Sequence, residues 1–265
     1  MDSIGQNIRF RHLAWKSGSW LRRNRVRSLL FVVMIALLAS LAVAEDAEPP
    51  PKPSSVELTT KDGVRLNAIY YEGTEGESTV PVVVIHDWNQ KEDGTTYETL
   101  AEYLQSKGYA VMLPDLRGHG SSTQQKNKFG KSRSLTSRNV IPENVVGDME
   151  AIRMFLLKEN NAKKLNLAAT TLIGVGKGAI LAARYAIYDW DNFARVPRND
   201  PGKQREVRFQ RGGEKDVKAL VLISPETKIG KQMKIDALAR HPEGGAGEVS
   251  TLILVGQKQV DGKSN

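Results

Sequence analysis

Short, wholly apolar runs alternate with amphipathic segments along most of this chain, and this alternation constrains the fold more than any other feature. Val82–Ile85 is a continuous apolar run of the kind that forms a strand buried on both faces. The residues after it place Tyr97, Leu100, Ala101 and Leu104 on one face of a helix. The cycle repeats, with strands expected at Tyr109–Leu113, Leu165–Ile173, Ala219–Ile223 and Thr251–Val255, and helices at Glu143–Lys158, Gly178–Tyr188 and Lys231–Arg240. Such alternation predicts a mostly parallel sheet with helices on both faces.

An antiparallel hairpin is expected to precede this pattern. Val56–Thr60 and Leu66–Tyr71 are β-rich runs, and the turn residues Lys61, Asp62 and Gly63 lie between them. The sequence therefore predicts an α/β fold in three layers, with an antiparallel hairpin at the amino-terminal end of its sheet.

The first 44 residues have the three parts of a Sec-type signal peptide. An arginine-rich stretch ends at Arg27, an apolar run extends over Leu29–Ala44, and Ala42, Val43 and Ala44 form a small-residue cleavage site. We expect export to the periplasm or the extracellular space, with cleavage after Ala44. An uncleaved amino-terminal membrane anchor is the alternative, and in either case membrane contact is expected only through this segment.

A proline-rich linker is expected over residues 45–54, because its clustered prolines lack backbone donors and favour an extended chain. The folded domain is then expected over residues 55–265. Within it, residues 189–218 are polar and basic, which predicts an exposed insertion that could contact an acidic partner.

The net charge of +8 does not indicate a nucleic-acid partner, because residues 1–44 hold seven basic residues against one acidic residue. The rest of the chain is nearly neutral. The 265 residues contain no cysteine, which excludes disulfides, thiolate catalysis and cysteine-ligated zinc. The four histidines are scattered along the sequence, so neither a metal site nor a cofactor is predicted.

Three motifs follow or connect the expected strands. His86, Asp87 and Trp88 follow the first parallel strand, and Pro114–Ser122 has the pattern D-x-R-G-x-G-x-S after the next. Leu172–Ala179 spans a strand-to-helix junction and reads L-I-G-V-G-K-G-A. On these motifs the chain, from about Val56 onward, resembles the α/β-hydrolase superfamily of serine esterases, peptidases and dienelactone hydrolases.

The resemblance implies a catalytic triad whose positions are altered here. Gly176 stands where the superfamily's G-x-S-x-G motif has its nucleophile, so no side chain is available for attack. Gln259 stands where the acid is expected, and Asp261 could replace it. The last strand and the histidine that follows it are not found before Asn265, so the triad is expected to be vacant.

The resemblance also assigns roles to residues around that position. His86, Asp87, Trp88 and Lys177 are expected at an oxyanion-hole-like pocket, where the charge of Asp87 has the wrong sign for stabilising an oxyanion. His86 and His119 are interpreted as structural. The residues expected to fix the conformation of the Pro114–Ser122 loop are Asp115, Arg117, Gly118, Gly120 and Ser122.

Leu172–Ala179 does not meet the full requirements of either of two nucleotide-binding motifs. The dinucleotide pattern G-x-G-x-x-A fits, but no acidic residue ends the next strand, and a phosphate-binding P-loop would need glycine at Thr171. Between Ile223 and Thr251 there is room for one helix but not for a lid domain, so any pocket is expected to be open.

These observations predict an exported, catalytically inactive protein that acts as a ligand-binding or interaction module, with a small ester-like molecule as one possible ligand. The alternative is an active hydrolase of ester or amide bonds that uses an unidentified nucleophile. Ser121, Ser122 and Ser224 lie near the carboxyl ends of strands, where open α/β sheets bind ligands. The oligomeric state is left open.

Overall fold

The computed structural model describes residues 49–89, 91–127, 129–194, 215–230, 233–245 and 249–256. The expected signal segment, the first part of the linker, most of the basic insertion, and Gln259 and Asp261 lie outside the described residues. No helix in these described ranges is both long enough and apolar enough to cross a membrane.

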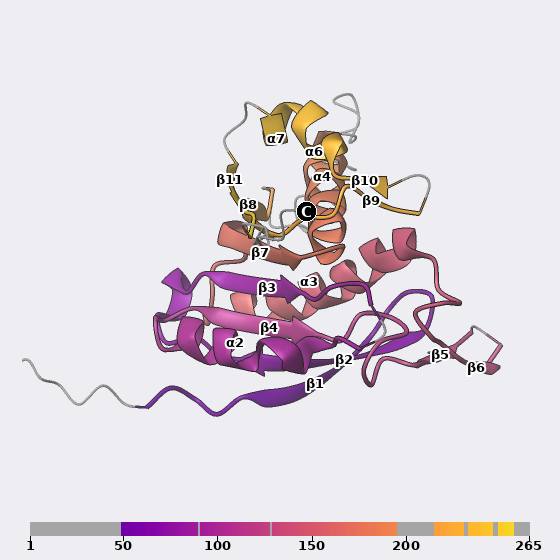
Figure 1. Ribbon diagram of the computed structural model, residues 1–265. Coiled ribbons are helices and arrows are strands. Elements are labelled where there is room, and N and C mark those ends of the chain that lie inside the picture. The colour runs from indigo at the N-terminus through magenta and orange to yellow at the C-terminus, as the bar shows by residue number, and fades with distance from the viewer. Residues whose placement is uncertain are drawn as a thin grey trace, which may run out of the picture. The chain divides into compact units, whose positions relative to one another are not determined.

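Nine strands of the described residues form one mixed sheet in the order β11-β8-β7-β3-β4-β2-β5-β6, with β1 paired to β2 (Figure 1). Its five parallel strands follow the crossover order expected of α/β units. They are β3 (Pro81–Ile85), β4 (Ala110–Pro114), β7 (Thr170–Val175), β8 (Val217–Ile223) and β11 (Ser250–Leu254).

The expected hairpin consists of β1 (Ser54–Thr59) and β2 (Val64–Tyr71), which pair antiparallel. On its other edge β2 pairs with β4, and with the short strand β5 (Gln124–Lys126). A further short strand, β6 (Ser132–Ser134), pairs antiparallel with β5. The mostly parallel sheet with an amino-terminal antiparallel hairpin is thus confirmed.

Helices cover both faces of the sheet and complete three layers. On one face, α3 (Val145–Asn161) and α4 (Gly178–Ala194) bury apolar side chains against the inward residues of β3, β4, β7 and β8. On the other face, α2 (Glu98–Gln105) packs against the alternate residues of the central strands. Because successive residues of a strand point to opposite faces, the wholly apolar run of β3 supplies both cores.

The structure corrects two expected elements. Residues 167–169 form a 3₁₀ turn rather than the start of β7, and the Asn166 side chain caps this turn by accepting from the Ala168 N–H at 3.1 Å. The expected helix at Lys231–Arg240 is only α6 (Asp236–Arg240), preceded by a small hairpin of β9 (Lys228–Ile229) and β10 (Met233–Lys234) and followed by α7 (Pro242–Gly245).

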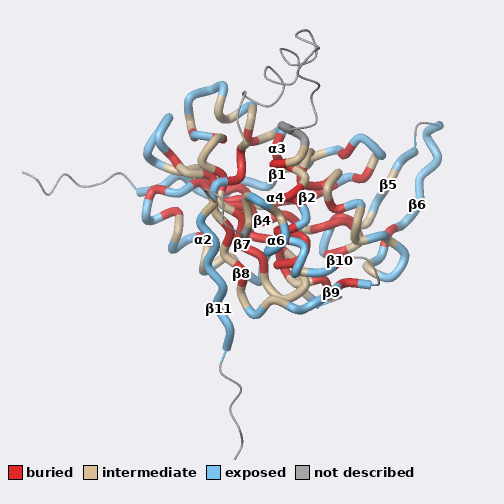
Figure 2. The backbone as a smooth tube through the Cα atoms, turned by 90° about the horizontal axis from the view of Figure 1, so that it is seen from above, coloured by how far each residue is buried: buried red, intermediate tan, exposed pale blue. Residues whose placement is uncertain are grey.

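The edges of the expected insertion belong to the folded core. Helix α4 continues to Ala194 and β8 begins at Val217, while residues 195–214 lie outside the described ranges. Asp189 is buried and accepts hydrogen bonds from the N–H groups of Asp216 and Val217, at 2.9 and 3.1 Å. Figure 2 shows the burial gradient, with β5, β6 and β11 exposed at the margins of the domain.

Two methionines on α3 offer a matched test of this packing. Met149 is 1% exposed in the core and Met154 is 58% exposed on the same helix. We expect Met149→Ala to lower the free energy of unfolding by about 2–5 kcal/mol, because it removes buried contacts and leaves a cavity. Met154→Ala is expected to change it by less than about 0.5 kcal/mol. Equal effects in chemical denaturation would contradict the burial of this helix face.

Candidate functional site: the β7–α4 elbow

The sharp turn between β7 and α4, hereafter the elbow, comprises Gly176 and Lys177. Gly176 has φ of +55°, in the left-handed region that glycine adopts without steric cost. Its N–H donates to the carbonyl of Ile223 at 3.0 Å, and its carbonyl accepts from the Glu226 N–H at 3.2 Å. The elbow is therefore fixed against the carboxyl end of β8.

The elbow also approaches the end of β3 closely. A Cβ atom at Gly178 would lie 2.4 Å from the carbonyl oxygens of Ile85 and His86. Glycine is required at this position because any side chain would separate the helix from the strand. This contact brings the loop after β3, which begins with His86 and Asp87, directly against the elbow.

The carboxylate of Asp87 fills the space beside Gly176. Its Oδ1 accepts from the backbone N–H of Lys177 at 2.8 Å. A Cβ built on Gly176 would lie 2.7 Å from both Cγ and Oδ1 of Asp87. The structure thus places the Asp87 carboxylate where a side chain of residue 176 would project.

This position is electrostatically favourable for a carboxylate. Lys177 immediately precedes α4, and the first N–H groups of a helix attract negative charge. The superfamily resemblance assigns the N–H after the nucleophile to the oxyanion hole. In the structure the Asp87 carboxylate itself accepts from this N–H, in addition to having the wrong sign of charge for an oxyanion hole.

A chain of side chains holds the second oxygen of Asp87. The amide nitrogen of Asn89 donates to Oδ2 of Asp87 at 3.1 Å and to Glu92 at 2.9 Å. The hydroxyl of Tyr97 donates to the other carboxylate oxygen of Glu92 at 2.8 Å. Burial, with the hydrogen bond to Glu92, raises the pKa of Tyr97, so its hydroxyl keeps its proton. Both oxygens of Asp87 therefore have donors.

The side chain of Lys177 leans toward Glu226, with Nζ 3.7 Å from the carboxylate. Both groups are partly exposed, so this ion pair contributes little to stability. It nevertheless places the Glu226 carboxylate beside the Lys177 ammonium group, which weakens the attraction of Lys177 for an external anion.

His86 and His119 are buried together with Trp88. His86 accepts from the Leu116 N–H through Nε2 at 3.1 Å, so Nδ1 carries the proton and donates to the Asp87 carbonyl at 2.8 Å. The ring of His119 packs edge-on against Trp88, with centroids 4.6 Å apart. Burial lowers the pKa of both histidines, which keeps them neutral. Among the described residues, neither ring is hydrogen-bonded to a serine hydroxyl.

The loop after β4 is fixed by backbone hydrogen bonds to Asp115. Its carboxylate accepts from the N–H groups of Gly94 at 2.9 Å and Ser121 at 2.7 Å. The hydroxyl of Ser122 donates to the Asp115 carbonyl at 2.7 Å and is fully buried. Gly118 and Gly120 also lie in this loop, and both have positive φ, 78° and 46°.

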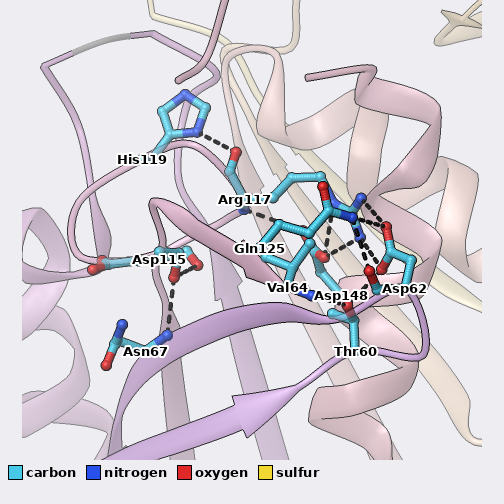
Figure 3. A network of polar contacts seen from close by, with 10 residues as sticks. Thr60, Asp62, Val64, Asn67, Asp115, Arg117, His119, Gln125 and Asp148 are labelled. Carbon is cyan, nitrogen blue, oxygen red and sulfur yellow. Dashed lines mark hydrogen bonds and ion pairs between the residues drawn. The ribbon is translucent and has the colours of Figure 1, made fainter. Parts of the chain in front are cut away.

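Arg117 leaves that loop and enters a buried network (Figure 3). Its guanidinium binds Asp148 of α3 through Nε at 2.9 Å and Nη2 at 2.7 Å, and it binds Asp62 of the β1–β2 turn through Nη1 at 2.9 Å. Burial raises the pKa of Asp148 to about 6, against the opposing effect of Arg117. Burial would also raise the pKa of Asp62, but hydrogen bonds from Arg117 and Thr60 hold it below its usual value.

Sequence reasoning missed Asp148 and the contact between Asp87 and Lys177. A signal for Asp148 exists, because it lies between Val145, Met149 and Ile152 at the spacing of the core-facing side of a helix. A carboxylate at such a position needs a buried partner. No local pattern indicates the contact of Asp87, which joins residues 90 positions apart.

Of the three candidate serines, only Ser224 is both exposed and beside the elbow. Ser224 has φ of +44°, and its N–H donates to the Leu254 carbonyl at 2.6 Å. The Ser122 hydroxyl is committed to the loop, and Ser121 contributes its backbone N–H to Asp115. Within the described part of the chain, no three histidine, aspartate or glutamate side chains gather as metal ligands would.

The sheet order, the hairpin and the elbow define an α/β-hydrolase fold. No protein-family model and no curated protein matches the sequence. Similar solved structures include an esterase from Pyrobaculum calidifontis, at 17% identity over 86% of this chain and 59% of that chain, with a TM-score of 0.48.

The α/β hydrolase GrgF from a Penicillium species is similar at 18% identity over 66% of this chain and 46% of that chain, with a TM-score of 0.46. An esterase from Pyrococcus furiosus is similar at 18% identity over 77% and 82% of the respective chains, with a TM-score of 0.45. The chain spans about half the length of GrgF and of the Pyrobaculum esterase (46% and 59%).

The two carboxylates that bind Arg117 are expected to contribute unequally to the free energy of unfolding. Asp148 is fully buried and the Asp62 side chain is 45% exposed. We expect Asp148→Ala to lower the free energy of unfolding by about 3–5 kcal/mol, because Arg117 is left as a buried charge with one partner fewer. Asp62→Ala should cost about 1 kcal/mol. Chemical denaturation of both variants tests this order, and a larger loss for Asp62→Ala would refute it.

Gly176 and Asp87 should be energetically coupled. Gly230→Ala is the control, because Gly230 has a similar φ of +59° and its Cβ would meet nothing within 4 Å. We expect this control to cost about 1–2 kcal/mol from backbone strain. Gly176→Ala should cost about 1–3 kcal/mol more, because its methyl group meets the Asp87 carboxylate.

In an Asp87→Ala background that excess cost should disappear, which a double-mutant cycle measures as a coupling energy. Additive effects of Gly176→Ala and Asp87→Ala would show that the carboxylate does not occupy this space.

Proposed function

We propose that this protein is exported and uses its α/β-hydrolase fold as a non-catalytic interaction or ligand-binding module. One observation carries the proposal. The elbow has a glycine in the nucleophile position, and the Asp87 carboxylate occupies the adjoining space and the Lys177 N–H. The amino-terminal pattern over residues 1–44 supports export.

The chemistry of acyl transfer opposes an active role for this elbow. Attack on a carbonyl develops negative charge on its oxygen, and that charge needs donors aimed at it. Here the donor of Lys177 already binds a carboxylate, whose negative charge would repel the developing oxyanion. A carboxylate ligand would meet the same repulsion, and the carbonyl oxygen of an ester would find the Lys177 N–H already hydrogen-bonded. This favours an interaction role over binding of an ester-like ligand at the elbow.

Ser224 supports the second candidate, an active hydrolase with an unrecognised nucleophile. It is exposed at the carboxyl end of β8, two residues before Glu226, whose N–H binds the Gly176 carbonyl at 3.2 Å. Its positive φ is uncommon for serine, and such backbone strain occurs more often at functional sites than elsewhere.

A turnover and labelling assay separates the two functions. We expect the purified protein to hydrolyse activated aryl esters, thioesters and aminoacyl amides at the buffer rate between about pH 6 and 9, the range of a histidine base. A fluorophosphonate probe should leave it unlabelled, because no serine hydroxyl of the described residues is hydrogen-bonded to a histidine that could activate it. Ser224→Ala is the matched variant. Turnover or labelling that Ser224→Ala abolishes would overturn the proposal and identify the nucleophile.

A further inference from the structure

The segment between Asp115 and Glu143 has an unusual charge pattern. Residues 116–142 contain no acidic side chain and six basic ones. One of these, Arg117, is buried in the network with Asp148 and Asp62. The other five belong to the β5–β6 hairpin and the residues just after it. They are Lys126, Lys128, Lys131, Arg133 and Arg138.

The hairpin extends from the edge of the sheet (Figures 1 and 2). It joins the domain at its base, where β5 pairs with Val64 and Arg65 of β2. Nearly all of its described residues are exposed. At its turn, Phe129 is 82% exposed and is the most exposed large apolar side chain of the described residues.

The turn is held in a defined conformation. Oδ1 of Asn127 accepts from the N–H groups of Phe129 at 3.0 Å and Lys131 at 2.9 Å. Gly130 completes the turn with φ of +79°, and its N–H donates to the Asn127 carbonyl at 2.9 Å. The backbone therefore presents Phe129 at the apex without a further ordering cost on binding.

The charges near the hairpin leave it positive. Asp62 in the β1–β2 turn contacts the hairpin through Gln125, and Arg117 shares its carboxylate. Arg133 donates to the neutral side chain of Gln125 at 2.7 Å and keeps its charge. Lys61 adds a further exposed ammonium in the adjoining β1–β2 turn.

We propose that the β5–β6 hairpin binds the surface of an anionic lipid bilayer. Phe129 enters the boundary between headgroups and acyl chains, where its apolar ring leaves water. Lys126, Lys131 and Arg133, which flank it, contact lipid phosphates, and each basic group near an anionic surface adds attraction. A polyanion alone would account for the charges but would leave an apolar apex in water. This contact is additional to the amino-terminal segment and independent of chemistry at the elbow.

Because the chain contains no cysteine, a single reporter can be placed on the hairpin of the full-length protein. Ser132→Cys introduces the attachment point at an exposed residue of β6, and an environment-sensitive fluorophore is coupled to it. The labelled protein is titrated with phosphatidylglycerol–phosphatidylcholine vesicles and with phosphatidylcholine vesicles. All variants share the amino-terminal segment, so differences in the signal come from the hairpin.

We expect a blue shift with anionic vesicles that weakens as salt is raised, and none with phosphatidylcholine alone. Phe129→Ser should weaken the partition coefficient by about tenfold, and Lys126→Glu with Lys131→Glu by at least about tenfold. The controls lie elsewhere on the exposed surface. Met154→Ser matches the loss of an apolar side chain, and Lys107→Glu with Lys158→Glu matches the change in charge.

Three results would overturn the proposal. They are the absence of a shift with anionic vesicles, equal losses in the hairpin variants and their controls, and a shift with heparin or a single-stranded oligonucleotide but not with vesicles. The last result would identify a polyanion surface.

Discussion

The contact between the Asp87 carboxylate and the amino-terminal end of α4 determines what the elbow can do. The carboxylate has a favourable partner in the Lys177 N–H, at 2.8 Å, and it fits only because residue 176 has no side chain. Glycine at 176 also removes the strain of a positive φ. One pair of residues thus supplies the negative charge and the space for it, and this pairing is the basis of the proposed non-catalytic role.

The surrounding structure holds that contact in place. Gly178 lets the elbow pack against the end of β3, which fixes where Asp87 begins. His86 then binds the loop after β4 through the Leu116 N–H, and Arg117 of that loop reaches Asp148 on α3 and Asp62 in the hairpin turn. Four segments distant in sequence are therefore joined by polar groups, most of them buried, whose geometry is more specific than that of an apolar core.

The sequence predicts the layers of this fold well because their signal is local. The apolar run of β3 and the helical spacing of α3 each specify which faces are buried. Local patterns fail where a contact or a polar turn decides the structure, as at Asp87 and at the polar hairpin of β5 and β6. They fail again at Met233 and Lys234, where helical spacing does not exclude the short strand β10. At Gly176 the local pattern succeeds. The motif around it predicts a strand-to-helix turn, and residue 176 lies between the end of β7 and the start of α4.

The elbow and the β5–β6 hairpin differ in the charges that they present. The elbow presents the carboxylates of Asp87 and Glu226, which contact the N–H and the ammonium group of Lys177. The β5–β6 hairpin has the opposite character, with positive charge around an exposed aromatic ring. The two surfaces also differ in how they are built, because the elbow depends on long-range packing and the hairpin turn on local hydrogen bonds with the side chain and backbone of Asn127. Changes in the hairpin can therefore alter recognition without disturbing the core.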